Sequence, residues 1–327
     1  MGCFFFCIYM SDSYRVIPIF LPMLACPHRC VYCNQFVISG QQKLPSLDDV
    51  TDLIDSYLKT IPADCHKRVA FFGGSFTCLP ENIQNRYLDA VQPYLQEGRI
   101  EGIQLSTRPD YIDEHILQNL KTKGVTLIEL GAQSLDDDIL RRCGRGHTVA
   151  DVESASRQIR SFGIDLGLQM MIGLPGDTKE KALHTASLIA SYGASCTRIY
   201  PTLVVEGTAL AEDYLAGRYT PLTLGEAVTW CKDLYAFFQS AGITVLRMGL
   251  HPTKDLREGE HLLAGPFHIS FKELVLTALW HDRIAAQIAK EGREDITVMV
   301  PPGEINYAVG YGSANRKAFP KVIMNYE

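Results

Sequence analysis

Short apolar runs alternate with amphipathic segments along most of the chain. In residues 46–61 the apolar positions recur every three or four residues, which places them on one face of a helix. Ser46 precedes this pattern as an N-cap, and Asp49 follows three residues later. Similar patterns predict helices at 80–95, 110–124, 136–143, 148–162, 178–193 and 223–242. The apolar runs, predicted as strands, cover 14–20, 68–74, 100–108, 125–134, 164–175, 196–204 and 243–251.

This repeated order of strand and helix predicts a parallel sheet with helices on its outside, curled by right-handed crossovers. Polar and glycine-rich stretches directly follow several of the strands, among them GGSFT, STRPD, GAQS and GLPGDT. The carboxyl ends of parallel strands share one edge, where barrels and open α/β sheets place their sites. The polar side chains expected at this edge are Ser75, Arg108, Gln133 and Gln169. The alternative is that these stretches are turns without a further role.

The pattern changes after residue 252. The rest of the chain contains a predicted helix near 270–290, a strand-like stretch at 295–302 and then a glycine-rich tail. We therefore predict three parts of the chain. They are an N-terminal tail at 1–12, a barrel at 13–252 and a C-terminal extension at 253–327 that packs on the barrel.

The composition is that of an ordinary globular protein, with 46% apolar and 21% charged residues. A net charge of −6 provides no overall basic field for nucleic acid, but it is compatible with a local basic patch. No apolar run reaches the roughly 20 residues that cross a bilayer, so we expect a cytoplasmic protein without membrane contact. The apolar start MGCFFFCIYM lacks a basic leader and a cleavage site, and we expect Met10 rather than Met1 to be the native start.

Three of the ten cysteines lie together in CPHRCVYC, directly after the first predicted strand. Clustered thiolates suit zinc or iron–sulfur clusters. A structural zinc site has four protein ligands, whereas this stretch supplies Cys26, Cys30 and Cys33, and His28 would be a strained fourth. The spacing leaves open a zinc site, a plain electron-transfer cluster, and a 4Fe-4S cluster with one iron free for a small molecule.

The Cys-x3-Cys-x2-Cys spacing, with Tyr32 before the last cysteine, resembles the signature of the radical S-adenosylmethionine (SAM) superfamily. The resemblance implies a partial (β/α)6 TIM-type barrel in which the three cysteines bind a 4Fe-4S cluster and the open iron chelates SAM. It further implies that an electron from the cluster cleaves SAM to a 5′-deoxyadenosyl radical, which abstracts hydrogen from a substrate. A one-electron donor of the flavodoxin or ferredoxin type is the implied partner.

The same resemblance indicates which residues bind SAM. GGSFT is similar to the glycine-rich motif of the superfamily, whose backbone receives the SAM amino group. In the porphyrin branch, the glutamine of the motif similar to GAQS contacts the ribose, and the arginine of the motif similar to RGHT pairs with the SAM carboxylate. Gln169 stands where that branch has an aspartate that holds a ribose hydroxyl. The implied SAM-binding residues are Tyr32, Gly73, Gly74, Ser75, Gln133, Arg145 and Gln169.

Longer stretches resemble the radical SAM domain of the Elongator catalytic subunit family, which modifies the wobble uridine of tRNA. They include STRPDYIDEHIL, ELGAQS, MMIGLPGDT and RIYPTLVVEGTALAEDYLAGRYTP. The cysteines of that family are more widely spaced, and its acetyltransferase domain has no room in this chain, so we expect SAM cleavage without acetyl transfer. The resemblance implies a tRNA base as substrate, and we expect Arg108 and Tyr200 at the barrel mouth to face it.

Basic residues of the extension are expected to contact RNA phosphates, the alternative being that they are ordinary surface charges. They are Lys254, Arg257, Arg316, Lys317 and Lys321. Two other functions remain open. One is a coproporphyrinogen-dehydrogenase-like or haem-handling radical SAM protein, because GAQS and GLPGDT fit that branch equally well. The other is a non-catalytic protein that binds zinc or an iron–sulfur cluster.

Overall fold

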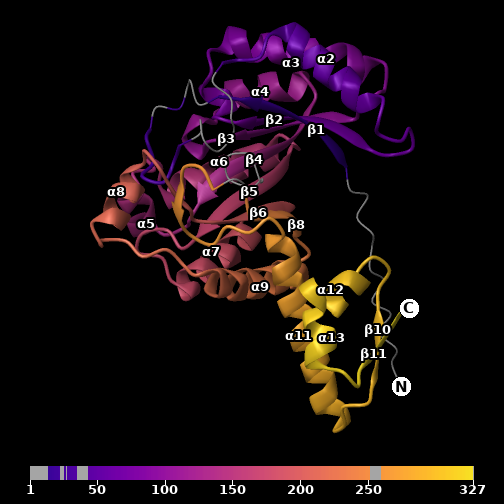
Figure 1. Cartoon of the computed structure of the whole chain (residues 1–327). Coiled ribbons are helices and arrows are strands. Elements are labelled where there is room, and N and C mark those ends of the chain that lie inside the picture. Colours follow the sequence, from indigo (N-terminus) through magenta and orange to yellow (C-terminus); the bar gives the residue numbers. More distant parts are fainter. Residues whose placement is uncertain (1–13, 23–25, 27, 35–42, 251–258, 327) are drawn as a thin grey trace.

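The centre of the molecule is one curled sheet of parallel strands in the order β1-β2-β3-β4-β5-β6-β8 (Figure 1). The computed structural model describes residues 14–22, 26, 28–34, 43–250 and 259–326. The strands are β1 (Arg15–Leu21), β2 (Lys67–Gly73), β3 (Gly102–Thr107), β4 (Val125–Gln133), β5 (Asp165–Ile172), β6 (Cys196–Pro201) and β8 (Thr244–Met248). This confirms the partial parallel barrel, with seven strands where the (β/α)6 pattern has six.

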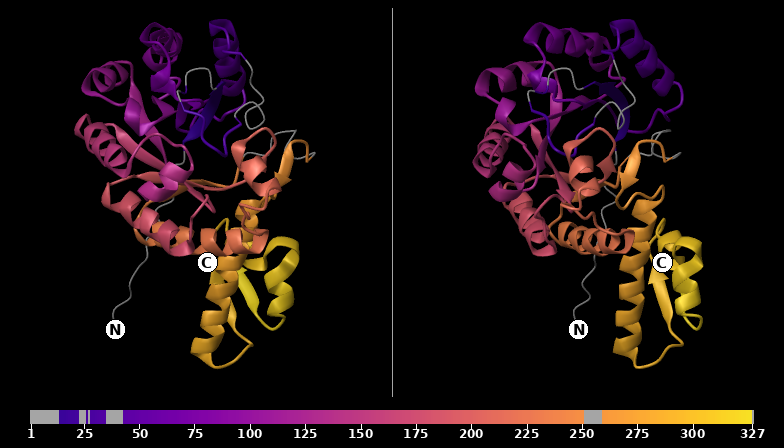
Figure 2. Two further views of the ribbon diagram at one scale, coloured as in Figure 1. Left: turned by 90° about the vertical axis from the view of Figure 1, so that its left-hand side faces the viewer. Right: turned by 60° about the vertical axis from the view of Figure 1, so that its left-hand side comes forward.

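Helices connect successive strands and cover the convex face of the sheet, which stays an open arc (Figure 2). They are α2 (Leu47–Leu58), α3 (Glu81–Gln96), α4 (Glu114–Thr122), α5 (Asp137–Arg142), α6 (Val149–Ser161), α7 (Lys179–Ser191) and α9 (Leu224–Ser240). The predicted cap of α2 is present, because the Asp49 N–H donates to the Ser46 hydroxyl (3.1 Å) and the Ser46 N–H donates to the Asp49 carboxylate (2.9 Å). No helix among the described residues is long and apolar enough to span a bilayer.

The two faces of the sheet differ in polarity. Successive side chains of a strand point to opposite faces, so in β4 Ile128 and Leu130 share one face and Glu129 lies on the other. Ile128 and Leu130 are fully buried in the main apolar core between sheet and helices. On the concave face, Glu129 meets Gln169 of β5 and Arg198 of β6. The barrel interior is therefore polar, while its outside carries the apolar core.

The chain after β6 departs from the predicted pattern. The strand expected to reach residue 204 ends at Pro201, and both the N–H and the hydroxyl of Thr202 donate to the Ile172 carbonyl (3.0 and 2.8 Å). A short antiparallel pair and an unpredicted helix follow. They are β7 (Val204–Val205), β9 (Leu262–Ala264) and α8 (Ala209–Leu215).

The C-terminal part shares its long helix with the barrel. α11 (Phe271–Glu291) buries Phe271 and Val275 in the main core. Further along the same helix, Trp280 and Ile284 belong to a second core. The other elements around this second core are β10 (Thr297–Val300), α12 (Ile305–Val309), the short η3 (Tyr311–Ser313), α13 (Ala314–Ala318) and β11 (Ile323–Tyr326).

The stretch described from its sequence as a glycine-rich tail is therefore ordered. β11 pairs in parallel with β10, and α12 and α13 lie between them in sequence. β11, α12 and α13 are four or five residues long, too short for a helical or strand period to appear in the sequence. The predicted division at 252 falls in residues 251–258, which lie outside the described residues, as do Met1 and Met10.

We predict that Ile284→Ala lowers the free energy of unfolding by about 3 kcal/mol, because it leaves a cavity in the second core. Ile284 is fully buried there. Ile269 is 60% exposed, and Ile269→Ala is the matched control with an expected change below about 0.5 kcal/mol. Urea denaturation followed by circular dichroism measures both. Equal losses in the two variants would contradict the second core.

Candidate active site

The cysteine stretch forms a loop after β1, at the carboxyl edge of the sheet. Cys30 is buried, whereas Cys26 and Cys33 are partly exposed. A turn joins the last two cysteines, in which the Cys33 N–H donates to the Cys30 carbonyl (3.0 Å). The Cys26 thiol lies 3.4 Å from the His28 carbonyl oxygen. The three sulfurs are thus held on one short loop at the edge where the sequence predicted a site.

Neighbouring segments hold this loop in place. The Val31 N–H donates to the Cys143 carbonyl at the end of α5 (3.0 Å), and the Val31 carbonyl accepts from the Leu210 N–H of α8 (2.8 Å). The His28 ring packs on Gly146, where a Cβ would lie 2.3 Å from a ring carbon. The His28 ring therefore packs the cysteine loop against Gly146.

Arg145 lies between the cysteine loop and the sheet. Its side chain is buried, with Nη1 3.6 Å from the Cys30 sulfur and Nη2 donating to the Gly131 carbonyl (2.7 Å). Burial by itself would lower the pKa of Arg145, but the neighbouring Tyr32 and Cys30 raise it above its ordinary value. The Arg145 guanidinium is therefore a fixed cation beside the Cys30 sulfur.

Four buried polar atoms around Arg145 have no hydrogen-bond partner among the described residues. They are the Tyr32 hydroxyl, Arg108 Nη1, Arg145 Nε and His147 Nδ1. Buried polar atoms in proteins are nearly always paired, so a group of unpaired ones marks a place for a polar ligand. Two guanidinium groups among them suit a carboxylate. The two guanidinium donors fit the methionine end of SAM, whose carboxylate needs such a cation.

His147 is neutral in this environment. Burial, together with the cations Arg145 and Arg108, lowers its pKa to about 2. Nε2 donates to the Ala132 carbonyl (3.3 Å), which leaves Nδ1 as a hydrogen-bond acceptor. His147 was not among the residues predicted from the sequence, although its place two residues after Arg145 in RGHT could have suggested it.

The glycine-rich motif closes the edge of β2. Gly73 has φ 109°, and a Cβ there would lie 2.1 Å from the Leu21 carbonyl oxygen, so only glycine permits this approach of β1. The Gly74 N–H donates to the same oxygen (2.9 Å). The Ser75 hydroxyl bonds to Thr107 (2.9 Å) and accepts from the Arg108 N–H (3.0 Å). A hydrogen bond from Ser75 to SAM would therefore compete with its bonds to Thr107 and to the Arg108 N–H.

Gln133 ends β4 in a strained conformation. Its φ of 65° lies in the left-handed region, and the register of β4 with β5 shifts between Gly131 and Gln133. Such a conformation costs about 1 kcal/mol or more for a residue other than glycine, and it is often found at binding sites. A Cβ at Gly131 would lie 2.7 Å from Arg145 Nη2 and 2.8 Å from Gln133 Nε2. Gly131, which the sequence analysis did not single out, makes the space in which these two side chains meet.

The two residues predicted to face the substrate lie in different surroundings. Arg108 is 2% exposed. Its Nε and Nη2 donate to Asp110 (2.9 Å each), and Nη2 also donates to the Arg145 carbonyl (2.6 Å), so only Nη1 remains. Tyr200 is partly exposed on β6, beside Arg198 on the concave face. Their substrate contact stays a prediction, with Arg108 closer to the SAM end of the site.

A carboxylate unnoticed in the sequence lies at the centre of the concave face. Glu129 is fully buried and accepts both Nε (2.5 Å) and Nη2 (3.0 Å) of Arg198. It also accepts from Gln169 Nε2 (3.2 Å) and from the Gln104 amide of β3. A single acidic residue inside the apolar strand VTLIELGAQ was the signal that could have revealed it, because a buried carboxylate requires partners.

The loop after β5 is held by its own turn and by a distant tyrosine. The Asp177 carboxylate accepts from the Gly173 N–H (2.8 Å), and the Tyr219 hydroxyl donates to the Gly173 carbonyl (2.6 Å). Burial raises the pKa of Asp177 to about 6. Tyr219 belongs to the GRY stretch after α8, so this contact joins the GLPGDT and GRY stretches in the folded chain.

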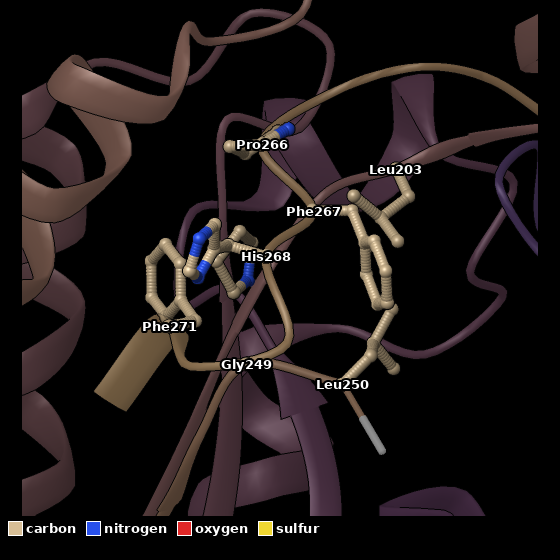
Figure 3. A pocket seen from close by; sticks show the side chains of 8 residues that line it. Leu203, Gly249, Leu250, Pro266, Phe267, His268 and Phe271 are labelled. Atoms are coloured by element: carbon tan, nitrogen blue, oxygen red, sulfur yellow. The ribbon is translucent and has the colours of Figure 1, made fainter. Parts of the chain in front are cut away.

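A small pocket at the ends of β6 and β8 is unsuited to a substrate. Figure 3 shows Phe267 packed between Leu203 and Leu250. The free space is about 10 Å³, at most enough for one water. His268 contributes a ring nitrogen, which accepts from the Ser270 N–H (3.0 Å). The polar groups suited to chemistry lie instead around Arg145.

The described residues also bear on the kind of metal group. In the described parts of the chain, no three His, Cys, Asp or Glu side chains converge on a single ion. In a 4Fe-4S cluster each cysteine binds its own iron, so the three sulfurs need not converge. Cys26, Cys30 and Cys33 thus fit such a cluster through their number, their common loop and the cation beside Cys30.

Comparisons with known proteins match this geometry. Residues 20–189 match the Radical SAM superfamily, and residues 194–281 match the Radical_SAM C-terminal domain. The chain is 30% identical over 252 residues to a tRNA uridine(34) acetyltransferase of Dehalococcoides mccartyi, a match that covers 65% of this chain and 54% of that protein. It is 29% identical over 204 residues to the heme chaperone HemW of Bacillus subtilis, covering 60% of this chain and 51% of that one.

The chain thus spans about half the length of these curated relatives. Among solved structures, the archaeal Methanocaldococcus infernus Elp3 with an N-terminal deletion (1–46) superposes with a TM-score of 0.62 at 22% identity. The match covers 85% of this chain and 63% of that one. At this identity the likeness concerns the fold.

We predict that Gly131→Ala weakens SAM binding about tenfold or more, because the added methyl displaces Arg145 from its place beside Cys30. Gly225→Ala is the matched control, since a Cβ there meets nothing within 4 Å. Equilibrium dialysis of the cluster-loaded protein under anaerobic conditions measures the dissociation constants. Unchanged SAM affinity in Gly131→Ala would contradict the placement of SAM at Arg145.

We predict that His147 makes the protein sensitive to acid. The pKa is lowered from 6.5 to about 2, so below about pH 6.5 the unfolded chain takes up a proton that the folded chain does not. His147 therefore leaves the free energy of unfolding unchanged above pH 6.5. Below that pH it lowers the free energy of unfolding by about 1 kcal/mol per pH unit. His147→Gln keeps a donor for the Ala132 carbonyl and cannot titrate.

Urea denaturation at pH 7, 6 and 5 measures the free energy of unfolding of both proteins. We expect this free energy to fall less between about pH 7 and 5 in His147→Gln than in the unsubstituted protein. Parallel pH dependence of the two proteins would show that His147 does not carry the effect.

Proposed function

This chain belongs to the radical SAM superfamily, and from this premise we propose that it cleaves SAM at a cluster held by Cys26, Cys30 and Cys33 and acts on a tRNA base. Enzymes of this superfamily use a 4Fe-4S cluster and SAM, and they require a one-electron donor. The group of unpaired buried polar atoms around Arg145 is the observation that carries the proposal for this chain.

The bound cluster and SAM supply the reductive cleavage of a carbon–sulfur bond, and the residues of this chain hold and orient the reactants. Cys30 lies deepest, with Arg145 beside it, so the SAM carboxylate can pair with Nε of the same guanidinium that approaches the sulfur. The backbone at Gly73 and Gly74 lies at the neighbouring strand end and suits the SAM amino group. Gln133, with its strained backbone, and Gly131, two residues earlier, line the site at the end of β4.

The exposed side of the cysteine loop suits the approach of an electron donor. Cys26 and Cys33 are partly exposed, whereas Cys30 faces inward. A flavodoxin or ferredoxin type of donor carries one electron at low potential, which is what this chemistry needs. We therefore propose that such a donor docks against the Cys26–Cys33 side of the loop.

The tRNA substrate is supported by the similarity to proteins named tRNA uridine(34) acetyltransferase, over 65% of this chain. In the C-terminal part, Arg316 and Lys317 are exposed on α13, whereas Lys321 pairs with Glu294 (3.1 Å). Lys254 and Arg257 lie outside the described residues. Arg316 and Lys317 are the proposed phosphate contacts that the described residues provide. The proposal covers radical formation and an RNA substrate, and it does not extend to acetyl transfer.

A haem-handling protein is the second candidate, because the similarity to the heme chaperone HemW covers 60% of this chain. Both candidates use the same SAM site, and they differ in the molecule that they bind besides SAM, which is tRNA in the first and haem in the second. Haem titration followed by absorbance separates the two, since haem bound to a protein ligand shifts its main absorption band.

We predict that anaerobically reconstituted protein with dithionite forms 5′-deoxyadenosine from SAM, and that bulk tRNA raises the yield while protoporphyrin does not. Cys30→Ala is expected to abolish the product, because one iron loses its ligand. Cys65 lies in the turn before β2, away from the loop, so Cys65→Ala is the matched control with unchanged yield. Liquid chromatography with mass detection measures the product.

Absence of 5′-deoxyadenosine from the unsubstituted protein would contradict the SAM reaction itself. Product formation that tRNA leaves unchanged, together with a haem absorption shift, would instead favour the haem-handling candidate.

A further inference from the structure

The concave face of the sheet carries an aromatic pair at the carboxyl ends of β1 and β2. Phe20 and Phe72 are in register, with their ring centroids 6.1 Å apart and their planes tilted by 42°. Their strand neighbours Ile19, Leu21 and Phe71 belong to the main core between sheet and helices. Because side chains alternate along a strand, the two rings of the pair point to the opposite side, into the barrel interior.

Arg198 covers one ring of this pair. Its guanidinium carbon lies 4.9 Å from the centre of the Phe72 ring, a cation–π contact that reaches from β6 across the interior to β2. Glu129 holds the same guanidinium from β4. Phe72 is thereby fixed by a side chain that is itself fixed. Phe20, by contrast, is 37% exposed.

The exposed Phe20 ring lies at the same edge as the groups proposed to hold the cluster and SAM. Phe20 stands at the end of β1, shortly before the cysteine loop, and Phe72 directly precedes the GGSFT motif. Tyr200 points to the same face from β6, two residues after Arg198 and nearer the carboxyl edge. A ligand that covers the Phe20 ring therefore lies close to the bound SAM.

The charges on this face favour a neutral ring over one that carries carboxylates. Arg198 and Arg247 are in register on β6 and β8, and both already have partners. Arg198 pairs with Glu129. Arg247 donates to two backbone carbonyls, those of Gly249 (2.9 Å) and Leu250 (3.2 Å). The carboxylates of a porphyrin would have to compete for these cations, whereas a pyrimidine base is planar and uncharged.

We propose that the Phe20 ring, supported by Phe72, is the surface on which the pyrimidine base of the RNA substrate stacks inside the barrel. The proposal rests on the proposed function, because it names the residue that receives the base at the same site. A base that enters a protein interior leaves its own stack, and stacking on an aromatic ring offsets part of that cost. Arg198 is then a positioning residue, which acts through Phe72.

The stacking contact is measured by comparing an RNA that carries the base with one that lacks it. The first probe is an anticodon stem-loop RNA with uridine at position 34, the position named in the similar tRNA-modifying proteins. The second probe is the same RNA with an abasic nucleotide there. Fluorescence anisotropy with cluster-loaded protein and SAM, under anaerobic conditions and without reductant, gives both dissociation constants.

We predict that the unsubstituted protein binds the uridine RNA about tenfold more tightly than the abasic RNA, as one stacked base provides. In Phe20→Leu this preference falls to within about twofold, because leucine keeps an apolar side chain but offers no ring. In Phe20→Trp the preference stays near tenfold, since the larger ring still stacks.

Tyr326→Leu is the matched control, because it also replaces an exposed aromatic residue by leucine. Tyr326 is 60% exposed on β11, which lies in the C-terminal part, apart from the main sheet (Figure 1). We expect the preference for the uridine RNA to stay near tenfold in this variant, as one stacked base provides. Should Phe20→Leu fail to fold, Phe20→Ile also removes the ring, with a branched side chain that suits a strand. The same loss of preference is expected.

Retention of the preference in the folded Phe20 variant without a ring would overturn the proposal. An equal affinity of the unsubstituted protein for both RNAs would do the same, as would loss of the preference in Tyr326→Leu. Haem binding that Phe20→Leu weakens, with the RNA preference intact, would assign the ring to the haem-handling candidate instead. These outcomes are distinct from failure of the SAM reaction, in which the unsubstituted protein with dithionite forms no 5′-deoxyadenosine.

Discussion

The Glu129 carboxylate joins four adjacent strands at the centre of the barrel. It accepts from Gln104 of β3, Gln169 of β5 and Arg198 of β6, and it belongs to β4. Removal of one partner from a buried ion pair costs about 3–5 kcal/mol, because the other charge is left uncompensated. The polar interior of an otherwise apolar sheet depends on this one satisfied carboxylate. The groups that are proposed to bind a ligand lie on the carboxyl side of Glu129, at the strand ends.

At these strand ends, Arg145 connects the sheet to the cysteine loop. One end of its guanidinium holds the Gly131 carbonyl, the other approaches Cys30, and its own carbonyl accepts from Arg108. The loop, the end of β4 and the RPD stretch after β3 are thereby fixed to one another before a ligand binds. A site prepared in this way loses little conformational entropy on binding, which favours a reactant that must be held in one geometry.

Three glycines near this edge also permit close contacts that a larger residue would prevent. Gly73 permits the close approach of β1, and Gly131 makes room for two polar side chains that a methyl group would separate. Gly146 receives the His28 ring and so anchors the cysteine loop. Each glycine serves a different contact, but all three keep backbone and side chains near the position where a ligand of several polar groups fits.

Most of the order of strands and helices was predictable from the chain alone, because the main elements are long enough to show their period and several helices begin with a side-chain cap, as α2 does at Ser46. The cysteine spacing likewise indicated a metal group, and its resemblance to the superfamily signature implied the 4Fe-4S cluster. The short elements β11 and α12 were missed, since packing rather than local sequence stabilises them.

For the site, the strand pattern indicated Gln133 at the carboxyl edge and the resemblance indicated Arg145. Gln169, which was also expected at this edge, lies inside β5. Only the tertiary structure decided what their atoms do. Arg108 proved to be bound to Asp110, Ser75 to Thr107, and Gln169 to a glutamate forty residues earlier in the chain. The physical reason is that hydrogen-bond partners of a buried group come from neighbouring strands, whose register and distance only the folded chain defines.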